Sequence, residues 1–146
     1  MEETFTIEKA ELPTLVENVL ARVTALETLG ARVIALHGDL GAGKTTFVQA
    51  LGSQLGVIEA ITSPTFTIMK AYELAGQDFT TLVHMDAYRI DNINELGPLR
   101  FAELLNDPQT LLCIEWAEKI AGALPQPLVN VSLVVSGEEA RTVVLS

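Results

Sequence analysis

The segment 38–46 constrains this sequence more than any other, because it has the form of a phosphate-binding loop. Gly38 and Gly43 bracket four residues and are followed at once by Lys44 and Thr45, which matches the pattern G-x-x-x-x-G-K-[ST]. The glycines let the backbone curl until successive N–H groups point at one anion. In such a loop the lysine carries positive charge to the β- and γ-phosphates, and the threonine hydroxyl is a Mg²⁺ ligand. The alternative is a glycine-rich turn in front of a helix.

The segments on either side favour a phosphate loop over that simpler turn. Residues 32–37 have the pattern of an apolar strand leading into the loop, and residues 45–55 that of a helix leading out, ended by Gly56. The exposed N–H groups and the dipole of a helix N-terminus favour an anion at this place. The residues expected to contact a bound nucleotide here are Gly38, Asp39, Leu40, Gly41, Ala42, Gly43, Lys44, Thr45 and Thr46.

The spacing of apolar residues predicts the remaining elements. Strands are expected at 5–7, 65–74, 79–85, 111–114, 128–135 and 141–145, and helices at 13–29 and, in one or two short pieces, at 91–106. Gly30 is expected to lie just past the end of the first helix. The strand 65–74 should place Ile68 and Tyr72 on one face and pair with 79–85 as a hairpin. The last two strands should form a second hairpin at the C-terminus.

Composition limits the class of protein. A chain of 146 residues with 49% apolar composition is expected to form one domain, 1–146, with a substantial core. The first four residues are acidic where a secretory signal would be basic, and no apolar run is long enough to cross a bilayer, so a soluble cytoplasmic protein is expected. Cys113, the only cysteine, lies in an apolar run and is expected to be a buried core residue.

The formal net charge of −10 argues against an extensive nucleic-acid surface. Such a surface needs clustered Lys and Arg to neutralise phosphates, whereas the nine basic residues here are scattered. DNA is therefore not an expected partner, and any role in nucleic-acid metabolism is expected to act through a partner protein.

Two carboxylates follow apolar strands. Asp86 follows 79–85 and Glu115 follows 111–114. An α/β sheet binds ligands at the carboxyl ends of its strands, and a strand of this kind carries an acid to the metal side of a phosphate loop. The alternatives are a cap or turn residue for Asp86 and a structural ion pair for Glu115. We favour Glu115 for Mg²⁺ and Asp86 for orienting water or the switch loop, and the two roles could be exchanged.

A polar connector, residues 61–66, follows the expected phosphate-loop helix. From composition, its simplest interpretation is a Ser-Pro turn before a strand. The functional interpretation is a switch-like loop, in which the hydroxyl of Thr65 or Ser63 reaches the γ-phosphate, Mg²⁺ or the attacking water.

Taken in series, four motifs resemble the TsaE family, also called YjeE, of small bacterial ATPases required for threonylcarbamoyladenosine modification of tRNA. The motifs are the phosphate loop 38–46, Ser63-Pro64-Thr65-Phe66, His84-Met85-Asp86-Ala87-Tyr88-Arg89 and Glu115-Trp116. The likeness covers nearly the whole chain in order. A phosphate loop alone is shared by many families, whereas the four motifs together are specific.

The resemblance implies an α/β fold of the P-loop NTPase type, a three-layer sandwich with a mixed, mostly parallel sheet. It implies an ATPase that binds ATP and Mg²⁺, is slow alone and works with a TsaD–TsaB heterodimer, so that tRNA is reached only indirectly. The catalytic residues it implies are Lys44, Thr65, Asp86 and Glu115, with Thr45 and Glu115 as Mg²⁺ ligands. Further nucleotide contacts are implied near Glu11 and Gly137.

Other functions stay open on the sequence. A small-molecule kinase usually has an arginine-rich lid, whereas the arginines here are scattered, and a GTPase would need a guanine-reading Asn-Lys-x-Asp-like tetrad, which is missing. A nucleotide-gated binding module, in which the ATP state controls partner assembly, cannot be separated from an ATPase by sequence. Arg89 is the candidate in cis for stabilising transition-state charge. If no arginine does so, hydrolysis should be slow until a partner completes the site.

Overall fold

The described residues, 2–39, 41–64, 68–75 and 78–146 of the computed structural model, form one seven-stranded mixed sheet. The strand order is β1 (Glu3–Glu8), β7 (Ala140–Leu145), β6 (Val129–Val135), β2 (Arg32–His37), β5 (Thr110–Glu115), β4 (Thr81–Asp86) and β3 (Met69–Glu73). The adjacent strands β6, β2, β5 and β4 are parallel, and the pairings toward both edges are antiparallel. Parallel strands in the centre require helical crossovers, which the chain supplies.

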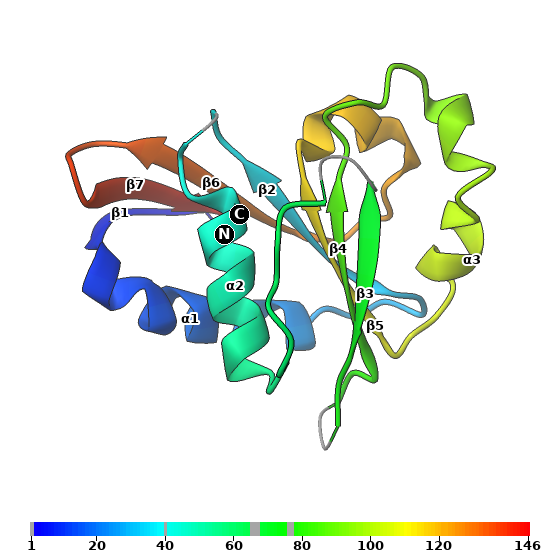
Figure 1. Ribbon diagram of the computed structural model, residues 1–146, viewed down its shortest axis with the longest axis horizontal. Helices are drawn as coiled ribbons and strands as arrows, with labels where there is room; N and C mark the ends of the chain where they lie inside the picture. The colour runs from blue at the N-terminus through cyan, green and yellow to red at the C-terminus, as the bar shows by residue number, and fades with distance from the viewer. Residues whose placement is uncertain (1, 40, 65–67, 76–77) are drawn as a thin grey trace.

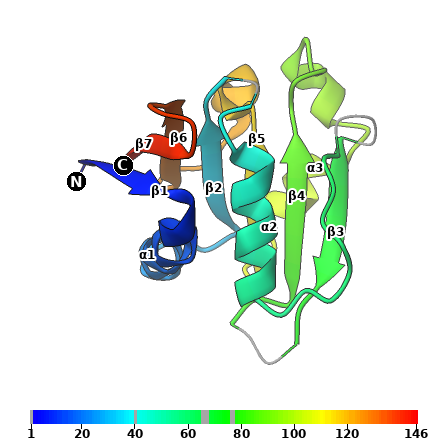
Figure 2. The same cartoon turned by 60° about the vertical axis from the view of Figure 1, so that its left-hand side comes forward.

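Helices cover both faces of the sheet, as Figures 1 and 2 show. Helices α1 (Leu12–Thr24) and α2 (Lys44–Gln54) pack on one face, and a short 3₁₀ turn, η1 (Lys9–Glu11), leads into α1. The other face carries η2 (Ile93–Leu96), α3 (Phe101–Leu105) and η3 (Ala117–Ala123). Each face has its own apolar core, so the predicted three-layer α/β sandwich with a C-terminal hairpin, β6–β7, is confirmed.

Side chains along β4 and β5 alternate between the two cores, because successive residues of a strand point to opposite faces. On β4, Leu82 belongs to the core under α1 and α2, whereas Val83 and Met85 belong to the other. On β5, Cys113 lies on the α2 side and Ile114 on the opposite side. His84, Asp86 and Glu115 follow the α2-side alternation, which directs them toward the start of α2.

The first helix is shorter than predicted. Helix α1 ends at Thr24 rather than near Leu29, which is 97% exposed. Leu26 still packs against the core from outside the helix, which is why the apolar spacing extended the prediction. Gly30 is not a helix cap: a Cβ there would lie 2.2 Å from the backbone oxygen of Leu105, so the glycine permits close approach to the end of α3.

The strand predicted at 65–74 also begins later. Strand β3 starts at Met69, because Ile68 has a left-handed φ of 67° that interrupts extended backbone. Residues 65–67 lie outside the described residues. Ile68 packs against the core opposite to that of Tyr72, so the predicted common face of these two side chains is wrong. The hairpin pairing of β3 with β4 is confirmed.

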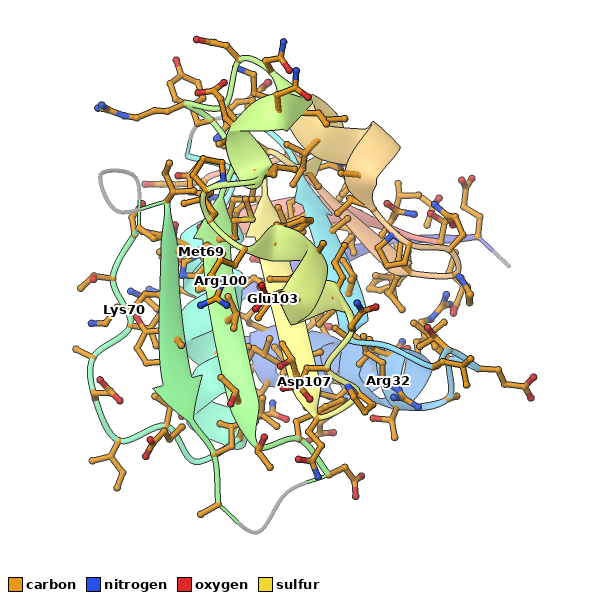
Figure 3. All side chains as sticks on the ribbon, turned by 90° about the vertical axis from the view of Figure 1, so that its right-hand side faces the viewer. Arg32, Met69, Lys70, Arg100, Glu103 and Asp107 are labelled. Carbon is orange, nitrogen blue, oxygen red and sulfur yellow. The ribbon has the colours of Figure 1, made fainter. Side chains whose placement is uncertain are left out.

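Strand β3 forms the outer edge of the sheet beside α3 (Figure 3). Met69 and Lys70 of β3 line a surface cavity of about 450 Å³ together with Arg100 and Glu103. Arg100 and Glu103 form an exposed ion pair of 3.0 Å. Among the described residues, no helix has the length and apolar character to span a bilayer.

Candidate functional site

The loop between β2 and α2 has the backbone that its glycines predict. Gly38 has a φ of 146°, and a Cβ there would lie 2.5 Å from the carbonyl oxygen of Leu133. Gly43, with a φ of 105°, is the N-cap residue of α2. Both positions disfavour an L side chain, the first also for lack of space. The loop therefore curls tightly around the N-terminus of α2, where unpaired N–H groups favour an anion.

Lys44 is the first residue of α2 and is only 5% exposed. Its Nζ donates to the backbone oxygen of Gly38 at 2.5 Å and lies 3.6 Å from the ring centroid of Trp116. Burial lowers the pKa of Lys44, and nearby acids, first Glu115, oppose that shift. The Lys44 ammonium is thus held at the loop by the Gly38 carbonyl and the face of the Trp116 ring, both of which are neutral groups that attract a cation.

Thr45 and Glu115 meet across the gap between α2 and β5. The Thr45 hydroxyl donates to Oε2 of Glu115 at 2.9 Å. The same carboxylate oxygen lies 2.5 Å from Nε2 of His84, a fully buried residue of β4. Glu115 is itself 4% exposed, so it is buried together with His84, and this contact leaves the structural pairing considered as its alternative open.

Asp86 lies beside Glu115, since the two are register partners at the ends of the parallel strands β4 and β5. It is 5% exposed, and its Oδ1 accepts a hydrogen bond of 2.9 Å from the backbone N–H of Tyr88. The turn role considered as the alternative for Asp86 is therefore present. It does not exclude the other, because Asp86 also faces a cavity that the phosphate loop lines.

This cavity, of about 290 Å³, brings together half of the site residues predicted from the sequence. Its lining comprises Gly41, Gly43, Lys44, Thr45, Thr46, Ser63, Asp86, Glu115, Trp116 and Arg141. The chain thus gathers a lysine, three hydroxyl groups and two carboxylates from four separate segments at the carboxyl ends of the parallel strands. This is the place where α/β sheets bind ligands.

A second cavity, of about 260 Å³, adjoins the first and shares Gly43, Thr46 and Arg141 with it. Apolar side chains of Ile7, Leu12 and Leu133 help to line it. A polar cavity at the loop next to a more apolar one fits a ligand with a phosphate end and a more apolar end.

Glu11 and Gly137, the two further predicted contacts, lie beside this second cavity and do not line it; their chain neighbours Leu12 and Glu138 do. The Glu11 carboxylate instead accepts a hydrogen bond of 2.9 Å from the backbone N–H of Glu8. The backbone oxygen of Gly137 accepts a hydrogen bond from Arg141 at 3.4 Å.

Arg141 was missed by the sequence analysis. Its Nε donates to the backbone oxygen of Ala42 at 2.9 Å, which ties β7 to the phosphate loop. Arg89, the arginine favoured from sequence, is exposed and does not line the cavity. A single arginine after a hairpin turn carries no local signal, and only the placement of β7 two strands from β2 brings it to the loop.

Thr65 and Leu40 are also predicted site residues, and both lie outside the described residues. Ser63, the other hydroxyl considered in that connector, lines the first cavity.

The donor set fits a hard divalent cation bound together with a phosphate. Among the described residues, no group of three or more His, Cys, Asp and Glu side chains could hold a metal by itself. Mg²⁺ does not need such a cage, because it is usually held by one or two protein oxygens, waters and the phosphates of a substrate. The Thr45 hydroxyl and the Glu115 carboxylate, 2.9 Å apart, supply that kind of partial site.

Comparison with known proteins decides the family. Residues 8–143 match the family model described as "Threonylcarbamoyl adenosine biosynthesis protein TsaE". The chain belongs to the TsaE family.

Individual members agree with that assignment. The chain is 36% identical to the tRNA threonylcarbamoyladenosine biosynthesis protein TsaE of Bacillus subtilis, over 85% of this chain and 75% of that one. It is 39% identical to the TsaE of Treponema pallidum, over 78% of this chain and 81% of that one. The crystal structure of Bacillus subtilis YdiB superposes with a TM-score of 0.67 at 27% identity, covering 99% of this chain and 84% of that one. The resemblance to TsaE drawn from four motifs is confirmed.

Proposed function

We propose that this chain is a Mg²⁺-dependent ATP-binding protein and slow ATPase that supports threonylcarbamoyladenosine modification of tRNA. Membership of the TsaE family supports the biosynthetic role. The observation that best supports ATPase activity is the hydrogen bond from Thr45 to Glu115, within the cavity that Lys44 also lines. It joins the hydroxyl of the phosphate loop to a buried carboxylate, which is the arrangement that P-loop enzymes use around Mg²⁺.

The roles of the residues follow from their positions. Lys44 and the loop N–H groups hold the β- and γ-phosphates, and Lys44 exchanges its hydrogen bond to Gly38 for the phosphate oxygens. Thr45 and Glu115 hold Mg²⁺. When bound, the metal neutralises charge on the phosphates that would otherwise oppose attack by water. Asp86, the last residue of the neighbouring strand β4, orients the attacking water.

Glu115 is favoured over Asp86 as the metal ligand because the Thr45 hydroxyl contacts Glu115. Asp86 accepts a hydrogen bond from the backbone N–H of Tyr88, within its own turn. The sequence alone left the two roles exchangeable, and the geometry supports one assignment.

Slow turnover is expected of the isolated protein. Arg141 lines the cavity, but its Nε and Nη1 groups are engaged by carbonyl oxygens of Ala42 and Ala140 at 2.9 and 2.8 Å. Two donor groups of the one arginine that lines this cavity are thus engaged by the protein's own carbonyl oxygens. We therefore propose that a TsaD–TsaB pair completes the site, and that tRNA is reached through that pair.

The experiment is Mg²⁺-dependent ATP hydrolysis by the purified protein, alone and with a TsaD–TsaB pair. Wild type is compared with Lys44→Ala, Glu115→Ala and a distant control, Glu103→Ala, whose carboxylate is exposed. We expect slow turnover that rises with the pair, disappears in the first two variants and is unchanged in the control.

Tight ATP binding without turnover, both alone and with the pair, would overturn the proposal that this protein is an ATPase. It would leave the nucleotide-gated binding module, in which ATP state sets assembly with the pair. The affinity for the pair with ATP, with ADP and with a non-hydrolysable analogue then measures that gating directly.

A further inference from the structure

His84 is a buried polar residue for which the proposed mechanism has no role. It lies on β4, has no exposed surface and belongs to the α2-side alternation of that strand. A histidine buried to this degree gives up its hydration and needs a specific partner to offset that loss. Its one described hydrogen-bond partner is the carboxylate of Glu115 on the neighbouring strand β5.

The contact between His84 and Glu115 is short, and its acceptor oxygen also accepts a hydrogen bond from Thr45. Nε2 of His84 lies 2.5 Å from Oε2 of Glu115, and the Thr45 hydroxyl donates to that same oxygen at 2.9 Å. Oε2 thus has one partner on the neighbouring strand β4 and another in the first turn of α2. Two donors that converge on one oxygen from different elements fix the torsion of a carboxylate, which is otherwise soft at its terminal bond.

The two ring nitrogens of His84 differ in their surroundings. Nδ1 is buried and has no hydrogen-bond partner in the described part of the chain. A carboxylate oxygen accepts only, so the ring proton is required at Nε2. His84 therefore donates its Nε2–H to Glu115, and in the described part of the chain this is the hydrogen bond that holds the ring.

We propose that His84 is a positioning residue, which holds the Glu115 carboxylate in the orientation that Mg²⁺ and nucleotide require. The inference rests on the proposed function, because it assigns a task toward the metal that Thr45 and Glu115 would hold. His84 does not touch the nucleotide or the metal; it acts through the carboxylate. Hydrogen-bonded partners of metal ligands typically change metal affinity by about 10- to 100-fold when they are removed.

The test replaces the donor while keeping the shape of the site. His84→Phe removes both nitrogens at similar size, and His84→Gln retains an N–H group that reaches as far as Nε2. His84→Met removes the donor with a flexible apolar chain, and serves if the phenylalanine variant does not fold. Leu82→Met, two residues earlier on the same face of β4, is the control for disturbance of the packing.

The measurement is ATP affinity by calorimetry as a function of Mg²⁺ concentration, with a parallel titration in EDTA. We expect the donor-free variant to need at least about tenfold more Mg²⁺ for half of the metal-dependent gain in affinity. Affinity in EDTA should stay within about twofold of wild type, because the loop N–H groups and Lys44 are untouched. His84→Gln should recover most of the loss, and Leu82→Met should match wild type.

Each other outcome overturns a different statement. If wild type itself gains no affinity from Mg²⁺, the proposed metal site fails before His84 is considered. If wild type shows the gain and the donor-free variant shows it at the same Mg²⁺ concentration, His84 does not position Glu115. If affinity falls equally with and without Mg²⁺, or glutamine gives no rescue, His84 acts on packing and the inference is wrong.

Discussion

The two faces of strands β4 and β5 differ in what they bury. Toward α2, the last residues of these strands are His84, Asp86 and Glu115, and all are at most 5% exposed. Toward α3 and η3, the side chains one position away are apolar, as Met85 and Ile114 are. The side chains at these strand ends are similarly buried on both faces, yet only the α2 face of the two strands carries buried ionisable groups.

The difference teaches what makes a buried charge tolerable here. On the α2 face, two of the buried charged groups have counterparts within reach: Glu115 has Thr45 and His84, and Lys44 has a carbonyl and the Trp116 ring. The opposite face has apolar neighbours of η2, α3 and η3. Burial of a charge costs several kcal/mol without partners and much less with them.

The largest effect is expected when a second carboxylate is placed one residue before Glu115, on the apolar face. Ile114→Glu places an acid on the apolar face, next to Glu115 in sequence and without its partners. We expect the free energy of unfolding to fall by about 3–5 kcal/mol or more. Urea denaturation at pH 7 measures it. Ile114→Val is the matched control and should cost about 0.5–1.5 kcal/mol. A loss below about 1 kcal/mol for Ile114→Glu would show that the two faces do not differ in this way.

Within the α2 face, the two acids should separate by function. We expect Asp86→Asn to bind MgATP within about threefold of wild type and to lose at least about 10²-fold in turnover, since it orients water. We expect Glu115→Gln to lose affinity for MgATP but not for ATP in EDTA. Calorimetry and single-turnover hydrolysis distinguish these outcomes. If the two variants show the reverse pattern, the roles of the acids are exchanged.

The sequence was sufficient for the loop and for the strands that support it. Periodicity located β2, β5 and the C-terminal hairpin within a residue or two, because β2 and β5 are buried and strongly apolar and β6 alternates between buried and partly exposed residues. The four motifs also identified the family. The loop residues and the acids could be singled out because each has a local chemical reason to stand where it does.

What the sequence did not reveal depends on contacts between distant segments. Gly30 was interpreted as a cap because its close approach to Leu105 has no local sign. The contact of His84 with Glu115 joins residues 31 positions apart, and that of Arg141 with Ala42 joins residues 99 apart. The 3₁₀ helix η3, which starts after the left-handed Trp116, was not predicted because short helices of this kind lack a long apolar period.

Arg141 offers a smaller perturbation that links both cavities. Arg141→Lys keeps the charge but cannot reproduce the fork that bonds Ala42 and Ala140. We expect ATP affinity to fall by about tenfold, which corresponds to one lost charge-assisted hydrogen bond. Arg100→Lys, on the exposed edge near α3, should have no effect on calorimetric titration with ATP. Equal affinity for Arg141→Lys and wild type would remove this residue from the site.

Cys113 marks where the α2 face changes from apolar to charged, and its effect should be the smallest. It is fully buried two residues before Glu115, and burial first, then the charge of Glu115, raise the pKa of its thiol well above the ordinary value. The folded protein keeps the thiol proton at a pH where the unfolded chain releases it. The unfolded state thus binds fewer protons, and stability falls as pH rises above the unfolded thiol pKa of about 8.5.

Between pH 7 and pH 9, this one group should lower the free energy of unfolding by about 0.8 kcal/mol. Cys113→Ala shifts stability at every pH through lost packing, so the quantity to compare is the change with pH, which should be smaller in the variant by that amount. Urea denaturation at both pH values measures it. A disulfide reagent gives an independent check at pH 8: the native thiol should stay unlabelled and react only after unfolding. Rapid labelling of the native protein would mean that water reaches this part of the α2 face, and that its buried charges are less isolated from solvent than the contrast between the faces implies.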